Sequence, residues 1–180
     1  MHSTLQRLSN ISALATTVIL SLLAAIAASS FLIPTPLDPS SLHISHLNVV
    51  LGRPNYQPRA HDREYAFVKF DLDADLRPLF HWNTKQVFVY LVADYSTPAN
   101  PDNTVVVWDR IVRSRRNARL RLDDAKQKYE FKDLSPSFGT NTTATFALHY
   151  QVQPYVGALQ GAEVVRTEPV AFPPVKRRSQ

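Results

Sequence analysis

The feature that most constrains this chain is an uncharged segment near its N-terminus. Residues 11–33 read ISALATTVILSLLAAIAASSFLI, which is 23 residues without an acidic or basic side chain. A helix of that length rises about 34 Å, enough to cross a hydrocarbon core of about 30 Å. Pro34 and Pro36 follow and favour a helix end there. The segment predicts a membrane-spanning helix over residues 11–33, between an N-terminus of residues 1–10 and a domain of residues 34–180.

A cleaved leader peptide is the alternative interpretation of the same segment. Arg7 supplies a positive charge before the apolar run, and the sequence AIA at residues 25–27 resembles a cleavage site. The mature chain would then begin near Ala28. However, the apolar run continues through Ile33 and exceeds the roughly 7–15 residues usual for a leader. An uncleaved anchor is therefore favoured.

Small side chains recur every four residues along this segment and would share one slanted face of the helix. Helices in lipid associate through such faces, because their backbones can approach closely. Frequent Ala and Ser in a weakly apolar helix is the alternative explanation. The predicted packing face, called the small-residue face below, consists of Ala13, Thr17, Ser21, Ala25 and Ser29.

Charges and a sequence motif predict the orientation. Arg7 precedes the segment, and no Lys or Arg follows it until Arg53. By the positive-inside rule, the N-terminus is cytosolic and residues 34–180 lie on the other side. The sequence NTT at residues 141–143 is an N-glycosylation acceptor, which is useful only on the lumenal side. Asn141 is therefore a candidate glycosylation site, although such sequences also occur by chance.

Composition limits the class of the remaining domain. About 145 residues follow the segment, which fits one domain rather than two. The chain has no cysteine, which excludes a disulfide framework, a thiolate zinc site and a cysteine nucleophile. Without Arg7, the 20 basic residues become 19 against 15 acidic ones, a net charge of +4. That excess is too small for a nucleic-acid-binding face, so no nucleic acid partner is expected.

Short segments typical of β-strands follow at regular spacing. The run VFVYLVADY at residues 87–95 is apolar enough to predict burial on both faces. Turn-forming residues at 96–103 and 133–140 separate the strongest segments. About seven or eight strands in one domain predict a mainly β fold, a β-sandwich. The predicted strands cover residues 42–51, 65–72, 87–95, 104–112, 119–122, 128–131, 143–152 and 162–170, with one helical turn at 76–80.

No catalytic, cofactor or metal-binding pattern emerges from the residues. His43 and His46 lie three apart in a predicted strand and so face opposite ways, which is wrong for sharing a metal ion. The run DLDADL at residues 71–76 lacks the Gly and Glu that a calcium loop needs. There is no Gly-x-Ser-x-Gly motif and, with four glycines in the chain, no phosphate-binding loop. The arginine-rich run at residues 110–121 is interpreted as a solvated strand edge, with lipid head groups, a partner or a substrate as alternatives.

One stretch resembles a known family. Residues 70–97 contain the patterns F-D-x-x-A-D-L-x-x-x-F, W-N-x-K-Q and Y-L-x-x-x-Y-S-T, and residues 108–111 contain W-D-x-I. These patterns are similar to those of the signal peptidase complex subunit 3 family, a glycoprotein subunit of the endoplasmic reticulum enzyme. The short N-terminus, the apolar segment and Asn141 fall where the family has them. The resemblance therefore spans most of the chain.

The resemblance implies a type II protein of the endoplasmic reticulum membrane with a lumenal β-sandwich. It implies a non-catalytic accessory subunit that supports the catalytic subunit, where the serine nucleophile and its histidine reside, during removal of signal peptides. Implied partners are that catalytic subunit, the other small membrane subunits, the lipid bilayer and the translocon. Two alternatives remain: a secreted or membrane-tethered β-sandwich binding module with no enzyme partner, and a hydrolase acting alone in the lumen.

Large aromatic residues within the matched patterns are candidate anchors of the core or of an interface. Such side chains bury much apolar area and often dominate interface energetics. Simple core packing is the alternative for each of them. The candidates are Trp82, Tyr90, Tyr95 and Trp108.

Overall fold

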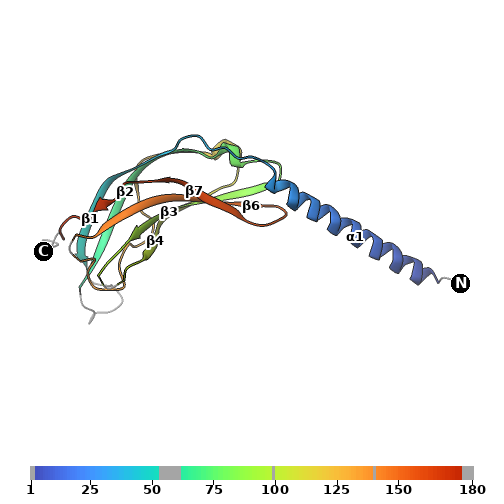
Figure 1. Ribbon diagram of the computed structural model, residues 1–180, viewed down its shortest axis with the longest axis horizontal. Coiled ribbons are helices and arrows are strands. Elements are labelled where there is room, and N and C mark those ends of the chain that lie inside the picture. Colours follow the sequence, from blue (N-terminus) through green and yellow to red (C-terminus); the bar gives the residue numbers. More distant parts are fainter. Residues whose placement is uncertain (1–2, 53–61, 99, 140, 176–180) are drawn as a thin grey trace.

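A long N-terminal helix projects from one end of a domain of antiparallel strands (Figure 1). The computed structural model describes residues 3–52, 62–98, 100–139 and 141–175. The elements are α1 (Thr4–Phe31), β1 (Ser41–Gly52), β2 (Arg63–Asp75), η1 (Arg77–Leu79), β3 (Thr84–Tyr95), β4 (Asn103–Val112), η2 (Arg115–Asn117), β5 (Arg119–Lys126), β6 (Thr143–Pro154), β7 (Gln160–Arg166) and β8 (Val170–Ala171).

The strands form two sheets that enclose one core. One sheet has the order β1-β2-β5, and the other has the order β4-β3-β6-β7, with β8 also pairing with β6. Phe70 of β2 and Leu91 of β3 are fully buried in the same apolar cluster, so the inner faces of both sheets contribute to it. This arrangement confirms the predicted mainly β fold with one N-terminal apolar helix.

Helix α1 begins earlier and ends slightly earlier than the predicted span of residues 11–33. Ser3 caps its first turn, since the Ser3 hydroxyl oxygen accepts a hydrogen bond from the Gln6 N–H at 3.2 Å. The helix ends before Pro34, as proline chemistry requires. Over 28 residues, α1 is long and apolar enough to cross a membrane by its length and composition.

The strand predicted over residues 128–131 is wrong. The Gln127 side chain replaces backbone pairing here, because it accepts from the Val68 N–H at 2.6 Å and donates to the Ala66 carbonyl at 3.0 Å. The chain then crosses to the other sheet, where its next two N–H groups donate to the Val107 carbonyl. The backbone partners of this segment are therefore divided between two sheets, and no strand forms.

The strand predicted over residues 162–170 is split into β7 and β8. The break contains Thr167, whose hydroxyl oxygen accepts from the Phe146 N–H at 3.0 Å. It also contains Pro169, which has no N–H to donate to a strand neighbour. A side chain and a proline thus interrupt the ladder between the two short strands.

Strand β3 is buried along its inner face, whereas on its outer face Val92 is buried and Phe88 and Tyr90 are only half-buried, so the prediction of burial on both faces holds in part. Val87, Val89 and Leu91 point into the core and are fully buried. Phe88 and Tyr90 alternate with them and are half-buried on the outer face. Their rings stack on each other there, with centroids 5.3 Å apart, so part of the apolar character of this run serves the outer surface.

Three connections meet at the end of the sandwich that carries α1. The strand registers place Thr84, at the start of β3, opposite Pro154 at the end of β6. They also place Val87 opposite Val112, at the end of β4. The segment before β3, the segment after β4 and the turn after β6 therefore share this end, while the start of β6 lies at the other end (Figure 1).

Candidate functional site at the junction of helix and sandwich

Asn83 joins α1 to the sandwich and is almost fully buried, with 2% of its surface exposed. Its side-chain amide donates to the Ser30 hydroxyl of α1 at 2.6 Å and to the Val156 carbonyl at 2.8 Å. Its side-chain carbonyl accepts from the Val156 N–H at 3.1 Å. One side chain therefore binds the last turn of α1 and the β6–β7 turn together.

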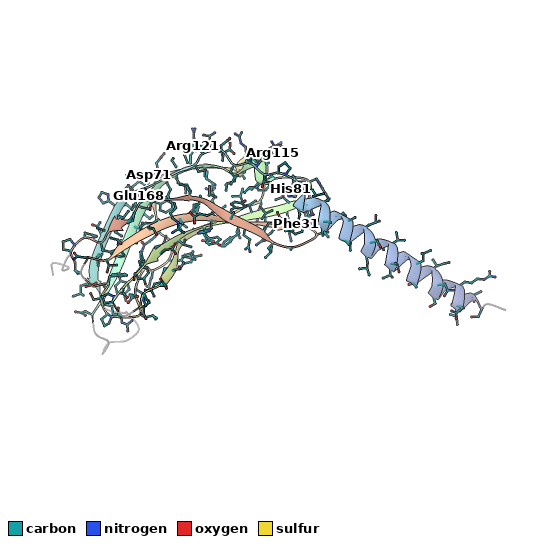
Figure 2. All side chains as sticks on the ribbon, in the orientation of Figure 1. Phe31, Asp71, His81, Arg115, Arg121 and Glu168 are labelled. Atoms are coloured by element: carbon teal, nitrogen blue, oxygen red, sulfur yellow. The ribbon has the colours of Figure 1, made fainter. Side chains whose placement is uncertain are left out.

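The β6–β7 turn also contacts α1 directly. Gly157 has a φ of +116°, which favours glycine. A Cβ atom built there would lie 3.2 Å from the Cβ of Ala27. Glycine thus permits both the turn geometry and a close approach between the turn and α1. Figure 2 shows Phe31, at the end of α1, near His81, which precedes Asn83 by two residues.

The two tryptophans among the candidate aromatic anchors occupy different environments. Trp108 is 6% exposed and packs edge-to-face on Phe70, with ring centroids 5.7 Å apart. Trp82 is 62% exposed and lies on the surface beside Asn83. The structure therefore separates the two tryptophans into a core residue and a surface residue at the junction.

Tyr95 belongs to an aromatic cluster at the opposite end of β3. Its ring contacts Phe131 and Phe138, with centroids 5.2 and 5.8 Å away. Its hydroxyl donates to the Asp133 carboxylate at 3.0 Å. Burial, together with this hydrogen bond to a carboxylate, raises the pKa of Tyr95.

Tyr90 lies on the outer face of the larger sheet. Its ring stacks on His149 of β6, with centroids 5.4 Å apart, as well as on Phe88. Ile111 of β4 is the strand partner of Phe88 and is exposed. Phe88, Tyr90, His149 and Ile111 are called the outer aromatic strip below. The strip lies on the outer surface of the larger sheet, where Ile111 is exposed and the three rings are half-buried.

The carboxylates of the DLDADL run bond to groups on the chain itself. Asp71 accepts from the Asp124 N–H at 2.6 Å, and Asp73 pairs with Arg121 at 3.3 Å. Asp75 accepts hydrogen bonds from Arg77, and this lowers the pKa of Asp75 to about 2. Across the described ranges, no group of three His, Asp or Glu side chains is placed to hold a metal ion.

The arginine-rich run divides into paired and unpaired members. Arg119 and Arg121 form ion pairs with Asp73 at 3.4 and 3.3 Å. The remaining members make no ion pair within the part of the chain that the structure describes, and they lie at or near the end of β4 that faces α1. These are Arg110, Arg113, Arg115 and Arg116. Figure 2 shows Arg115 at the same end of the sandwich as His81 and Phe31.

The small-residue face of α1 is almost uncovered by the described part of the chain. Its members are exposed, apart from the half-buried Ser29 at the junction. The hydroxyls of Thr17 and Ser21 donate to carbonyls four residues earlier at 2.9 Å. These polar groups are therefore satisfied within the helix, which makes the face compatible with lipid or with a second helix.

Asn141 lies at the end of the sandwich away from α1. It is exposed in a turn just before β6, with a φ of +62°. Strand β6 then runs 12 residues, about 40 Å at about 3.3 Å per residue, before it reaches the junction. Asn141 and Thr143 of the acceptor sequence are thus exposed and far from α1, while Thr142 between them is buried.

The junction itself was not predicted from the sequence. The pattern W-N-x-K-Q includes Asn83, but the partners of Asn83 lie 53 and 73 residues away along the chain. This five-residue pattern contains no signal for those distant partners. A buried amide beside an exposed Trp becomes evident only once the helix and both turns are placed.

Comparison with known proteins identifies the family. The sequence pattern described as "Signal peptidase subunit" matches residues 1–175. Signal peptidase complex subunit 3 of Saccharomyces cerevisiae is 36% identical over 174 residues, covering 92% of this chain and 93% of its own. The Drosophila melanogaster protein of the same name is 34% identical over 156 residues, covering 86% and 87%. These matches show that the chain belongs to the signal peptidase complex subunit 3 family.

Proposed function

We propose that this chain is a non-catalytic accessory subunit of the endoplasmic reticulum signal peptidase complex. The observation that carries the proposal is the family match over residues 1–175, which includes both α1 and the sandwich. In this role the catalytic serine and histidine belong to another subunit, which this chain supports while signal peptides are removed. The buried Asn83 link would make α1 and the sandwich act as one rigid support.

The proposal places α1 across the membrane with the sandwich in the lumen. The boundaries are a cytosolic N-terminus of residues 1–10, a spanning segment of residues 11–33 and a lumenal domain of residues 34–180. Residues 1–2 and 176–180 of these ranges lie outside the described part of the chain. The exposed apolar side chains along α1 and the single charge before it, Arg7, support this arrangement.

Two surfaces are proposed to contact the other subunits. In the membrane, the small-residue face of α1 would allow close approach of a second helix. In the lumen, the outer aromatic strip of Phe88, Tyr90, His149 and Ile111 offers large, partly desolvated rings next to an exposed aliphatic side chain. Both surfaces lack a partner within the described chain, which is expected of a subunit taken from its complex.

Co-purification in a mild detergent tests the accessory role. The tagged full-length chain is expected to bring down a catalytic signal peptidase subunit. Replacing Ser21 and Ala25 together by Leu should reduce the recovery of that subunit several-fold, because the added bulk separates the helix backbones. Recovery is measured by quantitative mass spectrometry against the tagged chain.

A control variant adds bulk at a position elsewhere on α1. Thr16 lies on a different side of the helix, so Thr16→Leu should leave recovery unchanged. Absence of the catalytic subunit from the unaltered chain's purification would falsify the proposed function. Equal losses in the control and the double variant would overturn the role of the small-residue face alone.

Glycosylation at Asn141 tests the lumenal orientation. When the chain is expressed in cells, endoglycosidase treatment is expected to increase its electrophoretic mobility, and Asn141→Gln should remove that shift. The exposed turn and the distance from α1 favour access for the modifying enzyme. Asn103→Gln, outside any acceptor sequence, serves as the control and should keep the shift. A chain whose mobility is unaffected by the endoglycosidase would contradict use of this site.

A further inference from the structure

The β6–β7 turn is apolar and exposed although it lies against α1. Residues 155–159 read YVGAL, and no charged side chain occurs from Tyr150 through Ala162. Tyr155 and Leu159 are 67% and 57% exposed. Turns on soluble surfaces are usually polar, so an uncharged turn with two large exposed side chains points to a non-aqueous neighbour.

The turn lies beside the last turn of α1 rather than beyond it. Gly157 approaches Ala27, which precedes the final residue of the helix, Phe31, by four positions. Four residues correspond to about 6 Å along the helix axis. If α1 spans a bilayer, this depth falls in the layer between head groups and acyl chains. Figure 1 shows the β6–β7 turn reaching alongside the base of α1.

Trp82 adds a second exposed aromatic group at this end. It directly precedes Asn83 in the sequence, and the Asn83 side chain bonds to both the turn and α1. Trp and Tyr are enriched where a bilayer meets water, because their rings are amphipathic. Trp82 and Tyr155 come from different connections and are both placed beside the end of the helix by the same buried amide.

The charges at this end favour a lipid surface over an apolar protein groove. The arginines without ion pairs, among them Arg113, Arg115 and Arg116, lie on the connection that follows β4, at the end of the sandwich near α1. The uncharged β6–β7 turn would meet the acyl chains at the bilayer surface. The basic side chains after β4 would meet the lipid phosphates that lie above those chains. A purely apolar protein groove would offer no negative charge for these arginines to pair with.

We propose that the Tyr155–Leu159 turn and Trp82 insert into the interfacial layer of the bilayer beside α1. This inference rests on the proposed function in one respect, namely that α1 spans the membrane. The sandwich then has two attachments to the bilayer, the helix and the turn. Together they fix its height and tilt above the membrane surface.

Depth-dependent fluorescence quenching tests the insertion. The chain has no cysteine, so single cysteines at Leu159, Leu22 and Leu134 can each carry one environment-sensitive dye. The full-length chain is placed in phosphatidylcholine nanodiscs containing lipids with a nitroxide either near the ester or near the end of the acyl chain. At Leu159 the dye should lose fluorescence mainly to the shallow nitroxide.

The other two positions are matched controls. Leu22 lies in the middle of α1 and should be quenched mainly by the deep nitroxide, which tests the anchor itself. Leu134 is exposed on a loop of the sandwich and should be quenched by neither. Quenching at Leu22 without quenching at Leu159 overturns the inference and leaves the anchor intact. No quenching at either position overturns the anchor and the inference with it.

Photo-crosslinking in the complete complex distinguishes lipid from protein as the neighbour. A benzophenone amino acid at position 159 should form adducts with lipid and not with another subunit. A protein adduct at that position, with a lipid adduct from a benzophenone at position 22, would show that a subunit covers the turn, and the lipid assignment would be wrong.

Discussion

Replacing Trp108 by alanine is expected to lower the free energy of unfolding by about 3–5 kcal/mol, the usual cost of removing a large aromatic side chain from a core. Trp108 is 6% exposed and packs edge-to-face on Phe70. The ammonium of Lys128 lies 5.7 Å from the centroid of its ring, and this contact would also be lost. At about 2–4 °C per kcal/mol for a chain of this size, the melting temperature should fall by roughly 10 °C.

Trp82→Ala provides the matched control for Trp108→Ala. Trp82 is largely exposed, so in detergent its replacement should change the free energy of unfolding by less than about 0.5 kcal/mol. Both variants are compared by thermal unfolding in the same detergent, followed by circular dichroism. Similar costs for the two variants would show that the assignment of Trp108 to the core and Trp82 to the surface is wrong.

The two tryptophans also show what the sequence could and could not predict. Both are large aromatic residues that occur in family patterns, and both were candidate anchors of the core or of an interface. Trp108 lies within β4, and its strand position directs it inward. Trp82 lies in the connection before β3, where no periodicity fixes the direction of a side chain. Exposure in a connection depends on how the sheets are stacked, and local residues do not encode that.

The strands themselves were largely predictable, because runs rich in Val, Ile, Tyr and Phe favour extended backbone wherever they pack. The predictions over residues 87–95 and 104–112 differ from β3 and β4 by at most three residues at one end. Which strands pair with each other was harder to predict from the sequence, since β5 pairs with β2 rather than with its sequence neighbour β4. The wrong strand at residues 128–131 has the same origin, because its partners are distant in sequence and lie on two sheets.

The junction is the part of the structure that the sequence predicts least, because its interactions join segments far apart in the chain. The sequence correctly favours an apolar helix followed by a β domain, but it does not indicate that the two are fastened together. That link depends on a buried amide whose partners are Ser30 and Val156. It determines how α1 and the sandwich move relative to each other, so it bears on any role as a rigid support.

Asn83→Ala is expected to destabilise the chain by about 3 kcal/mol, because it removes three hydrogen bonds and leaves the half-buried N–H and carbonyl groups of Val156 without these partners. Ser30 loses less, since its hydroxyl also lies 3.2 Å from the Ile26 carbonyl. The measurement is thermal unfolding in detergent, combined with hydrogen exchange of the β6–β7 turn, which should become faster. The substitution removes the hydrogen bonds between α1 and the β6–β7 turn while leaving both the helix and the sheets in place.

Asn103→Ala is the matched control for Asn83→Ala, because the half-buried Asn103 side chain makes one hydrogen bond, to the Asn100 carbonyl at 2.9 Å. It should cost about 1 kcal/mol or less and leave exchange in the β6–β7 turn unchanged. An Asn83→Ala variant no less stable than Asn103→Ala, with normal protection of the turn, would mean that the Asn83 side chain does not hold α1 against the sandwich. Faster exchange at the turn, with the sandwich core still protected, is instead the result expected when the end of α1 separates from the β6–β7 turn.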